Sequence, residues 1–389
     1  MKKFQFVKGA AVGCLFSGVI LLTTTAFIDK YDYIDKKLSV IEGAIAEHYV
    51  GDLDEEKMEE GIYKGFVSAV GDPYTVYYTP DEFASFMEKS SGVYAGIGVQ
   101  MTLDTNDNTI LVTDVFPGSP AEKAGMLPKD KIVGAEGQEL TGDEFDLAPE
   151  IIKGEPGTEV TVSVFRASDN KTYDLKMKRE NVIYPSVNYE MLENQVGYIQ
   201  IRQFEELTYD QFKEGLITLE EENAKGIIID LRNNTGGLLH ITEQIVDELI
   251  PKGLIVSTKD NTGKVDETYS DDVYTDIPLV VLVNEQSASA SEVLSGALKD
   301  HDRAPLVGTR TFGKGIVQSI MPLTDGSAIK ITTSQYFTPS GVCIQGEGIE
   351  PDYEVTLAPE LMVKAKIEKE EDTQLKKAIE ILESQIIGQ

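Results

Sequence analysis

The hydrophobic pattern starts with an uncharged, mostly apolar run from Gly9 to Ile28, which follows a short basic stretch. A helix of about 20 residues spans the roughly 30 Å of a bilayer core, and basic flanks stay in the cytoplasm. The pattern therefore predicts a membrane anchor or signal segment in residues 1–29, with the rest of the chain extracytoplasmic. Thr24 and Ala26 loosely fit a cleavage site, so both a single-pass cell-membrane protein and a secreted protein stay open.

Residues 30–90 have the apolar spacing of helices. Apolar side chains recur three or four positions apart, a helical period, at Ile34, Leu38, Ile41 and Ile45 and again at Met58, Ile62 and Phe66. The segment from Thr79 to Glu82 combines an N-cap, a proline at the first helical position and a capping-box glutamate. We expect a helical N-terminal domain here, whose apolar stripe packs internally or forms a dimer face.

Residues 91–181 read as short strands separated by glycine and aspartate turns. A glycine-rich segment, Gly96, Ile97, Gly98 and Val99, opens a strand, and the stretches Val160–Arg166 and Lys171–Met177 have the pattern of a closing hairpin. The order of these pieces, with Pro117–Ala121 starting a short helix, resembles a PDZ domain of bacterial exported proteases. In such a domain, free backbone N–H groups of the glycine-rich loop bind a chain-terminal carboxylate, and the bound tail adds a strand.

Residues 182–356 alternate strand and helix, and residues 357–389 read as a C-terminal helical extension. The nearly continuous apolar strands, such as Gly226–Leu231 and Pro278–Val283, are typical of a parallel α/β layer. The last helix is expected from roughly Pro359 to Ile387. The fold class is thus α/β plus a β-rich module, with a membrane helix and a helical N-terminal domain in front.

Composition narrows the function. The 389 residues carry 35 basic and 66 acidic side chains, a net charge of −31, so the chain lacks the basic excess that binds a phosphate backbone, and we expect no nucleic-acid partner. Only 2 cysteines and 3 histidines occur, without metal-ligand spacing. We therefore expect no metal and no cofactor.

Polar residues follow two of the predicted strands, where open α/β sheets collect functional groups. The first strand runs into Asp230-Leu-Arg-Asn-Asn-Thr-Gly-Gly237, and the second into Asn284–Glu292, which starts a helix. Hydroxyls at a helix N-terminus lie where free N–H groups favour a developing oxyanion. The residues alone do not choose among Ser287, Ser289 and Ser291, and serines also cap helices without any catalytic role.

A serine nucleophile needs a base, and Lys314 between Gly313 and Gly315 is the candidate. A lysine works as a base near neutral pH if burial lowers its pKa from about 10.4 by roughly three units. Gln318, four residues on, shares its face and can orient the neutral amine. The competing interpretations are a solvated lysine in a glycine turn and a hydrolase that uses His240 or His301.

Together these motifs resemble the carboxy-terminal processing proteases, also called tail-specific proteases, which are serine peptidases with an embedded PDZ domain. The similarity extends from Gly71–Thr75 through Gly346–Asp352 and includes both strand-end motifs, Thr311–Gln318 and Tyr336–Gly341.

The resemblance implies Ser289 as nucleophile, Lys314 as general base and Gln318 as its orienting partner. It also implies the backbone N–H groups of Ala290 and Gly237 as oxyanion donors. The substrates would be proteins or peptides with free C-terminal tails, and the family's habit, with the terminal helices, favours a homodimer. A non-catalytic PDZ scaffold with an inactive protease-like domain is the alternative function.

Overall fold

The structure is a computed structural model that describes residues 32–362 and 367–387. The expected membrane segment from Gly9 to Ile28 lies outside this range, and no helix within it is both long and apolar enough to cross a bilayer. The chain divides between Phe66 and Val67 into two compact units, each described by itself below.

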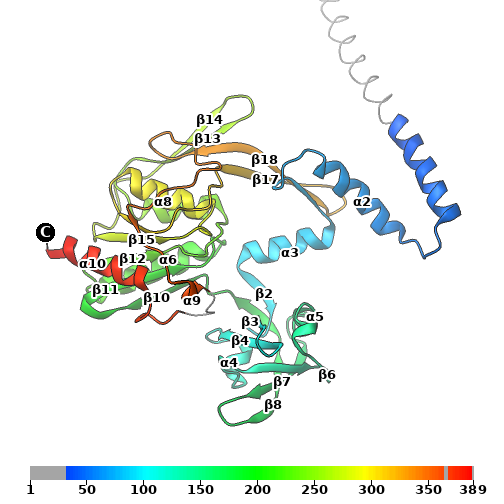
Figure 1. Ribbon diagram of the computed structural model, residues 1–389, viewed down its shortest axis with the longest axis horizontal. Coiled ribbons are helices and arrows are strands. Elements are labelled where there is room, and N and C mark those ends of the chain that lie inside the picture. The colour runs from blue at the N-terminus through cyan, green and yellow to red at the C-terminus, as the bar shows by residue number, and fades with distance from the viewer. Residues whose placement is uncertain (1–31, 363–366, 388–389) are drawn as a thin grey trace, which may run out of the picture. The chain divides into compact units, whose positions relative to one another are not determined.

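The N-terminal unit is helical, as the spacing predicts. One helix covers residues 32–48 and the next, α2, covers Glu55–Ser68 (Figure 1). No residue of α2 is buried, and the side chain of Phe66 is 68% exposed. The predicted helices are therefore present, but most apolar side chains of their stripe are not covered by other described residues.

The capping signal after residue 78 is confirmed. Helix α3 covers Pro80–Ser91, with Thr79 as N-cap and reciprocal hydrogen bonds between Thr79 and Glu82. Just before it, β1 (Val76–Tyr78) pairs with β18 of the C-terminal sheet. Residues 76–78, which the sequence places in the helical domain, thus complete a sheet of the second unit.

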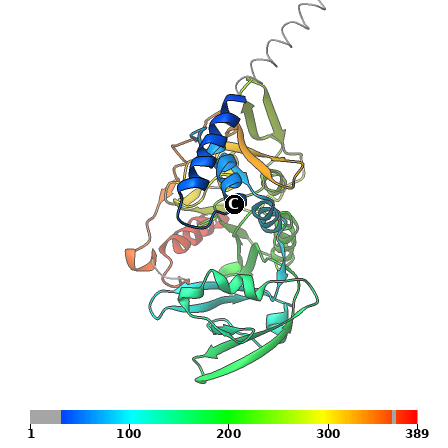
Figure 2. The same cartoon turned by 90° about the vertical axis from the view of Figure 1, so that its right-hand side faces the viewer.

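A short ribbon and an antiparallel sheet follow α3. The ribbon pairs β2 (Val93–Gly96) with β9 (Glu180–Ile183). The sheet has the order β3-β4-β5-β7-β8, with β6 on the edge of β5. It is the cyan and green sheet at the bottom of Figure 2. Its elements are β3 (Val99–Asp104), β4 (Thr109–Val115), α4 (Pro120–Lys123), β5 (Lys131–Ala135), β6 (Gln138–Glu139), α5 (Leu147–Ile152), β7 (Glu159–Arg166) and β8 (Lys171–Lys178). The predicted short helix and closing hairpin both occur, around a separate apolar core.

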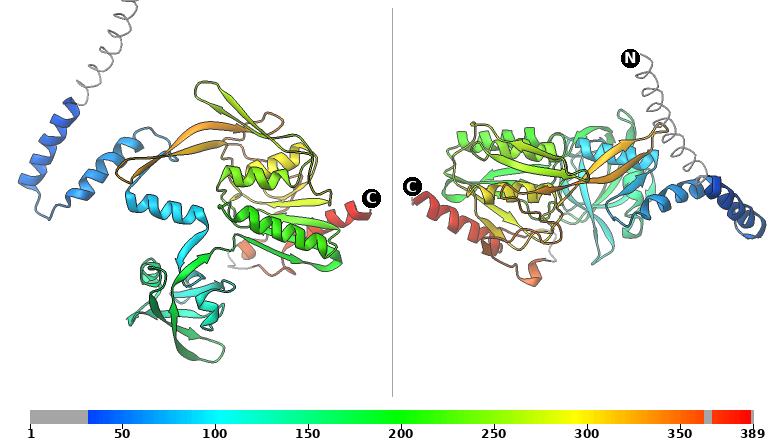
Figure 3. Two further views of the ribbon diagram at one scale, coloured as in Figure 1. Left: turned by 180° about the vertical axis from the view of Figure 1, so that it is seen from behind. Right: turned by 90° about the horizontal axis from the view of Figure 1, so that it is seen from above.

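The central sheet of the second unit has the order β10-β11-β12-β15-β16-β19, antiparallel only at β10. Its strands are β10 (Val187–Met191), β11 (Val196–Ile201), β12 (Gly226–Asp230), β15 (Leu279–Val283), β16 (Leu306–Gly308) and β19 (Tyr353–Glu354). Helices cover both faces: α6 (Thr208–Glu221), α7 (Leu239–Asp247) and α8 (Ala290–Asp300) pack on one, and α10 (Thr373–Ile387) on the other (Figure 3).

Burial on both faces explains the continuous apolar strands. In β12, Ile227 and Ile229 join the core under α6, α7 and α8, whereas Ile228 packs under α10. Successive side chains of a strand point to opposite faces, so the three consecutive isoleucines of β12 are all buried. The predicted parallel α/β layer is therefore present.

A second sheet has the order β1-β18-β13-β14, with β17 paired to β18. Its further strands are β13 (Leu254–Asp260), β14 (Val265–Tyr269), β17 (Ile316–Pro322) and β18 (Ala328–Phe337). No residue of β17 is fully buried. The hairpin of β17 and β18 is therefore less tightly packed than the central sheet.

The expected single C-terminal helix is wrong. The structure has a short helix α9 (Pro359–Met362) and a separate α10, and residues 367–372 are not helical. Asp372 accepts a hydrogen bond from the backbone N–H of Leu375, 2.9 Å, so its side chain caps a new helix start.

Candidate active site

The two polar segments predicted at strand ends lie side by side. Strands β12 and β15 are parallel neighbours, with Asp230 opposite Leu282. The β12 loop (residues 231–238) and the β15 loop (residues 284–289) therefore leave the sheet at the same edge.

Asn234 ties these two loops together and is fully buried. Its carbonyl accepts from Ala288 N, 3.0 Å, and from Ser291 Oγ, 2.8 Å. Its side-chain oxygen accepts from Gly236 N, 2.9 Å, and its amide donates to Ile201 O, 2.8 Å. The role of Asn234 is not predictable from local sequence, because its partners come from distant segments.

The structure separates the three candidate serines. The Ser287 hydroxyl donates to Leu231 O, 2.9 Å, and the Ser291 hydroxyl to Asn234 O, and both residues are fully buried. Ser289 is only part buried, and its hydroxyl donates to no acceptor within the described residues. Of the three, Ser289 alone has a hydroxyl that is free to react.

Ser289 also has a strained backbone, with φ 55° and ψ −113° directly before α8. Such a conformation costs a non-glycine residue about 1–3 kcal/mol and persists only where its surroundings hold it. Here Ser289 N donates to Glu292 Oε2, 2.8 Å, and Tyr336 Oη donates to Ser289 O, 3.1 Å. The strain sets the hydroxyl at the positive end of the α8 dipole.

Backbone N–H groups with no acceptor lie around this serine. Neither Gly237 N nor Ala290 N has a hydrogen-bond acceptor within residues 32–362 and 367–387. A Cβ added to Gly236 would lie 2.9 Å from Ser289 Cβ and 3.0 Å from Ala290 N. The glycine pair thus allows the β12 loop to approach the serine closely, and the free N–H groups suit an oxyanion.

Glu292 joins the serine to the lysine segment (residues 311–318). Its carboxylate is fully buried and accepts from Ser289 N, Gly313 N and Lys314 N at 2.7–2.8 Å, and from Thr311 Oγ1 at 2.6 Å. Local sequence predicts only part of the role of Glu292. An S-x-x-E pattern at a helix start indicates a cap, but not the second segment that the same carboxylate binds.

Lys314 is half-buried, and its ammonium lies 4.8 Å from the ring centroid of Tyr74. Burial lowers the pKa of Lys314, and the positive charge of Lys330 lowers it further, while Asp72 and Glu292 oppose the shift. Among the described residues, its ammonium makes no hydrogen bond with Ser289. The expected desolvation of the lysine is present, whereas direct contact with the serine is not.

Gln318 lies on β17, four positions after Lys314, where the pairing with β18 shifts register. Its amide donates to Ile316 O at 3.4 Å and does not reach the lysine. The opposite residue, Thr332, donates through its hydroxyl to Asp72 Oδ2, 2.6 Å. Ser289, Ala290 and Gly237 therefore lie together, and Glu292 joins the Lys314 backbone to them. Within the described residues, neither the Lys314 ammonium nor the Gln318 amide makes a hydrogen bond with Ser289.

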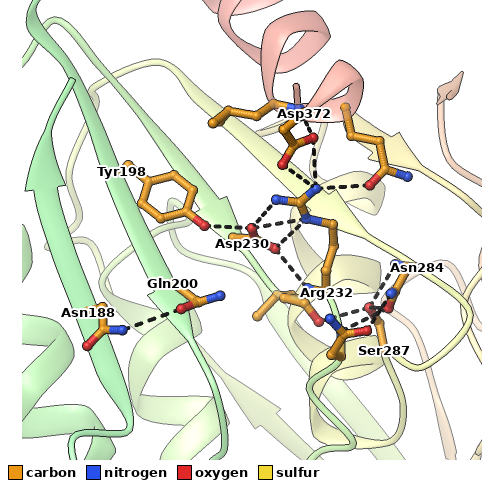
Figure 4. A network of polar contacts seen from close by, with 12 residues as sticks. Asn188, Tyr198, Gln200, Asp230, Arg232, Asn284, Ser287 and Asp372 are labelled. Carbon is orange, nitrogen blue, oxygen red and sulfur yellow. Dashed lines mark hydrogen bonds and ion pairs between the residues drawn. The ribbon is translucent and has the colours of Figure 1, made fainter. Parts of the chain in front are cut away.

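The polar motif at the end of β12 is explained by a buried ion-pair network (Figure 4). Arg232 binds Asp230 with its Nε and Nη2, 2.6–3.0 Å, and Tyr198 Oη donates to Asp230 Oδ2, 2.7 Å. Arg232 Nη1 also reaches Asp372 and Gln374 at the start of α10. The network fastens the β12 loop to the C-terminal helix.

The glycine-rich loop of the β-rich module also keeps free donors. Neither Ile97 N nor Gly98 N has an acceptor in the part of the chain that the structure describes. Gly98 has φ 80°, and a Cβ there would lie 2.3 Å from Ser119 Cβ, so the position requires glycine. Gly96 ends β2 and Val99 begins β3 on either side of these donors.

The histidines are engaged elsewhere. His240 Nε2 lies 3.3 Å from Glu206 Oε2, and His301 Nε2 lies 2.8 Å from Leu254 O. Neither hydrogen bond involves a serine, so nothing in this geometry favours a histidine base.

Comparison with known proteins identifies the family. Residues 195–355 match the description "Peptidase family S41", and residues 95–177 match "PDZ domain". The "Probable CtpA-like serine protease" of Staphylococcus aureus (strain COL) is 36% identical over 371 residues, which cover 90% of this chain and 72% of that protein. The chain belongs to peptidase family S41. It is a serine protease of the C-terminal processing type, as the sequence resemblance implies.

Solved structures of S41 proteases are also similar to this chain. The "photosystem II D1 C-terminal processing protease" is 31% identical, with 77% of this chain and 81% of that chain covered and a TM-score of 0.48. The "S41 protease from Bacteroides fragilis NCTC 9343" is 16% identical, covers 82% of this chain and 90% of that one, and has a TM-score of 0.57. The second likeness shows the shared fold.

Proposed function

We propose that this S41 chain is a membrane-anchored, extracytoplasmic endopeptidase that cuts protein substrates recognised by their C-terminal tails. Ser289 is the nucleophile and Lys314 the general base. The observation that carries the proposal is the strained, unengaged Ser289 beside two free N–H groups at a helix N-terminus. Such an arrangement stabilises the tetrahedral oxyanion of acyl transfer.

In the proposed reaction, the neutral Lys314 amine takes the hydroxyl proton while Ser289 Oγ attacks the peptide carbonyl. The oxyanion accepts hydrogen bonds from Gly237 N and Ala290 N. The Lys314 ammonium then protonates the leaving amine, which yields an acyl-enzyme and the free C-terminal fragment. Water, deprotonated by Lys314, hydrolyses the ester and restores Ser289.

The position of Lys314 over Tyr74 supports a resting arrangement that precedes this reaction. A cation over an aromatic face is stabilised in its charged form, whereas a general base must be neutral. Catalysis therefore requires the Lys314 side chain to turn from Tyr74 toward Ser289, while the Lys314 backbone N–H stays on Glu292, which also binds Ser289 N. In the moved position, the Gln318 amide oxygen accepts a hydrogen bond from the amine and orients it.

The PDZ loop from Gly96 to Val99 is the proposed binding site for substrate tails. The free Ile97 and Gly98 N–H groups support carboxylate binding, and the tail would extend along β3. The membrane anchor rests on the apolar run of residues 9–28. A homodimer through the exposed apolar side chains of the N-terminal helices completes the proposal.

Replacing Ser289 tests this function directly. We expect Ser289→Ala in the full chain to reduce cleavage of an unstructured protein with a free C-terminus by roughly 10³-fold or more. The control is Ser39→Ala, an exposed serine of the first helix, which should cleave like the wild type. Cleavage products are counted by mass spectrometry.

Two outcomes would contradict the proposal. Undiminished cleavage by Ser289→Ala would remove Ser289 as nucleophile. Tail binding without cleavage by the wild type would favour the alternative of a non-catalytic PDZ scaffold.

A further inference from the structure

A cavity of about 300 Å³ lies where the PDZ domain, the β2–β9 ribbon and the protease core meet. One water molecule occupies about 30 Å³ in the liquid, so the cavity has room for a long side chain. The PDZ side supplies Val99, Gln100, Phe116 and Lys153, the ribbon supplies Tyr94 and Tyr184, and the core supplies Glu205.

The walls of the cavity are aromatic. The ring of Phe116 contacts both Tyr94 and Tyr184 edge-on, with centroids 6.3 and 5.7 Å apart. One cation already uses this surface, because Lys153 Nζ lies 5.3 Å from the Tyr94 centroid with Glu88 as its counterion, 2.7 Å away. Aromatic faces with a carboxylate nearby form a general recognition site for organic cations.

Two buried polar atoms in the cavity lack partners. Neither Glu205 Oε2 nor the Tyr94 hydroxyl has a hydrogen bond, although both atoms are out of contact with solvent. Leaving such a group unpaired costs about 1–3 kcal/mol, and more if it is charged. Burial raises the pKa of Glu205 to about 7. The cavity therefore holds a carboxyl group that has no cationic partner among the described residues.

We propose that this cavity binds a basic side chain, lysine or arginine, from the C-terminal tail of a substrate. The ammonium or guanidinium group donates to Glu205 and the aliphatic stem lies against Phe116 and Tyr184. This inference rests on the proposed recognition of tails and adds a preference that a carboxylate-binding loop alone does not provide.

The geometry allows one tail to use both features. Val99 lines the cavity and directly follows the Ile97 and Gly98 N–H groups, at the start of the strand that a tail would extend. A tail whose carboxylate is bound at those donors therefore passes the cavity within its last few residues.

The cavity also adjoins the active site through the backbone. Glu205 follows Phe204, whose N–H donates to Gly236 O, 3.1 Å, and whose carbonyl accepts from Leu238 N, 2.8 Å. Phe204 therefore binds the segment that contains Gly236 and Gly237, beside Ser289. A cation bound to Glu205 contacts the residue that follows Phe204 in the chain. This adjacency gives tail recognition a short path to the oxyanion site.

The test measures peptide binding to full-length Ser289→Ala protein by fluorescence anisotropy. Ten-residue peptides with free carboxyl ends carry a single lysine at each of the last five positions in turn, and a matched set carries norleucine instead. We expect lysine to bind about tenfold or more tightly than norleucine at one position. Glu205→Gln should abolish that preference and leave the norleucine peptides unchanged.

The matched control is Glu206→Gln, the exposed carboxylate next in the chain, which should keep the lysine preference. No preference at any position, or a preference that survives Glu205→Gln, would overturn the inference. Peptides with amidated ends separate the two proposals. If amidated and free peptides bind equally, the protein does not recognise the terminal carboxylate. The comparison with Glu205→Gln then still shows whether Glu205 causes the lysine preference.

A second arm needs no peptide. Millimolar n-butylammonium, a mimic of the lysine side chain, should raise the Tm of the wild type and not that of Glu205→Gln. Equal shifts in both proteins would contradict the inference.

A pH series sharpens the result. The groups facing Glu205 are Glu88 and Lys89 from α3, Tyr94 from β2, Lys153 after α5 and Tyr184 after β9. Because Glu205 must ionise to bind the cation, affinity for the lysine peptide should rise between about pH 6 and 7 and level off above, with no such rise for norleucine. A flat profile for both peptides would remove Glu205 as the binding group.

Discussion

The nucleophile region and the lysine region of this S41 protease are held in different ways. Around Ser289, the carboxylate of Glu292, the amide of Asn234 and the hydroxyls of Ser287 and Ser291 are fully buried, with hydrogen-bond partners for each. Lys314 is half-buried and lies two residues before β17, and Gln318 is half-buried on β17, which has no fully buried residue. The backbone of the lysine segment is held as well, because Phe312 N donates to Ser287 O, 3.0 Å, and Gly315 N to Gln345 Oε1, 2.8 Å. The two regions therefore differ mainly in the packing of their side chains.

The two regions therefore suit different parts of the reaction, oxyanion stabilisation and proton transfer. Preorganised donors stabilise an oxyanion only if they are already in position, which suits the buried region. A base whose side chain lies on an aromatic ring can turn away from the serine and back without rebuilding those donors. The anchor points of the hairpin are Glu292, which binds Lys314 N, and Asp72, which binds Thr332.

The largest effect should come from Glu292, because it belongs to both regions. In Glu292→Gln, an amide NH₂ faces backbone N–H donors, so at least one buried donor loses its acceptor. We expect a loss of about 1–3 kcal/mol in the free energy of unfolding, measured with urea. We also expect kcat to fall by roughly 10³-fold or more, since both loops shift.

Glu285→Gln is the control for that variant, because the Glu285 carboxylate is exposed in the same β15 loop and accepts a hydrogen bond from the Thr309 hydroxyl. Equal behaviour of the two glutamate variants would remove Glu292 as the link between the regions.

A smaller effect is expected from Gly236→Ala, which perturbs the nucleophile region alone. The new Cβ meets Ser289 Cβ and Ala290 N at 3.0 Å or less. We expect kcat to fall about 10²-fold. Gly263→Ala imposes similar backbone strain, with φ 87°, but its Cβ meets nothing within 4 Å. If both variants lose the same activity, backbone strain, and not the close approach to Ser289, explains why position 236 requires glycine.

The smallest expected effect concerns the charge around Lys314. The Lys330 charge lowers the pKa of Lys314 and the Asp72 charge raises it. The active base is the neutral amine, so the rate falls as pH drops below the Lys314 pKa. Lys330→Gln should therefore move the acidic limb of kcat to higher pH and slow cleavage a few-fold on that limb, and Asp72→Asn should move it to lower pH. Shifts in the same direction would contradict the assignment of Lys314 as base.

Much of the fold follows from local pattern. The capping box at Thr79, the hairpin of β7 and β8 and the continuous apolar strands β12 and β15 each have a signal within a few residues. The placement of two polar loops at one sheet edge follows from parallel pairing. The break between α9 and α10 was missed, because the apolar spacing continues across a helix start that Asp372 caps.

The site was less predictable, because its partners are distant in sequence. The residues alone could not choose among the three serines, since the choice depends on buried acceptors in the β12 loop. Nothing near Lys314 predicts Tyr74 as its neighbour, and nothing near Asn234 predicts its role in joining the loops. Local patterns carry information on elements, whereas the polar partners of a site come from the tertiary fold.

The central claim is that Lys314 acts as a neutral base for Ser289, and Lys314→Arg tests it most directly. Arginine keeps the positive charge and length but does not lose its proton in proteins. The measurement is kcat for peptide cleavage from pH 6 to 10, with Lys330→Arg as a charge-conserving control. The account predicts that Lys314→Arg is inactive at every pH while Lys330→Arg cleaves with an unchanged pH profile. Cleavage by Lys314→Arg within tenfold of the wild type would contradict it.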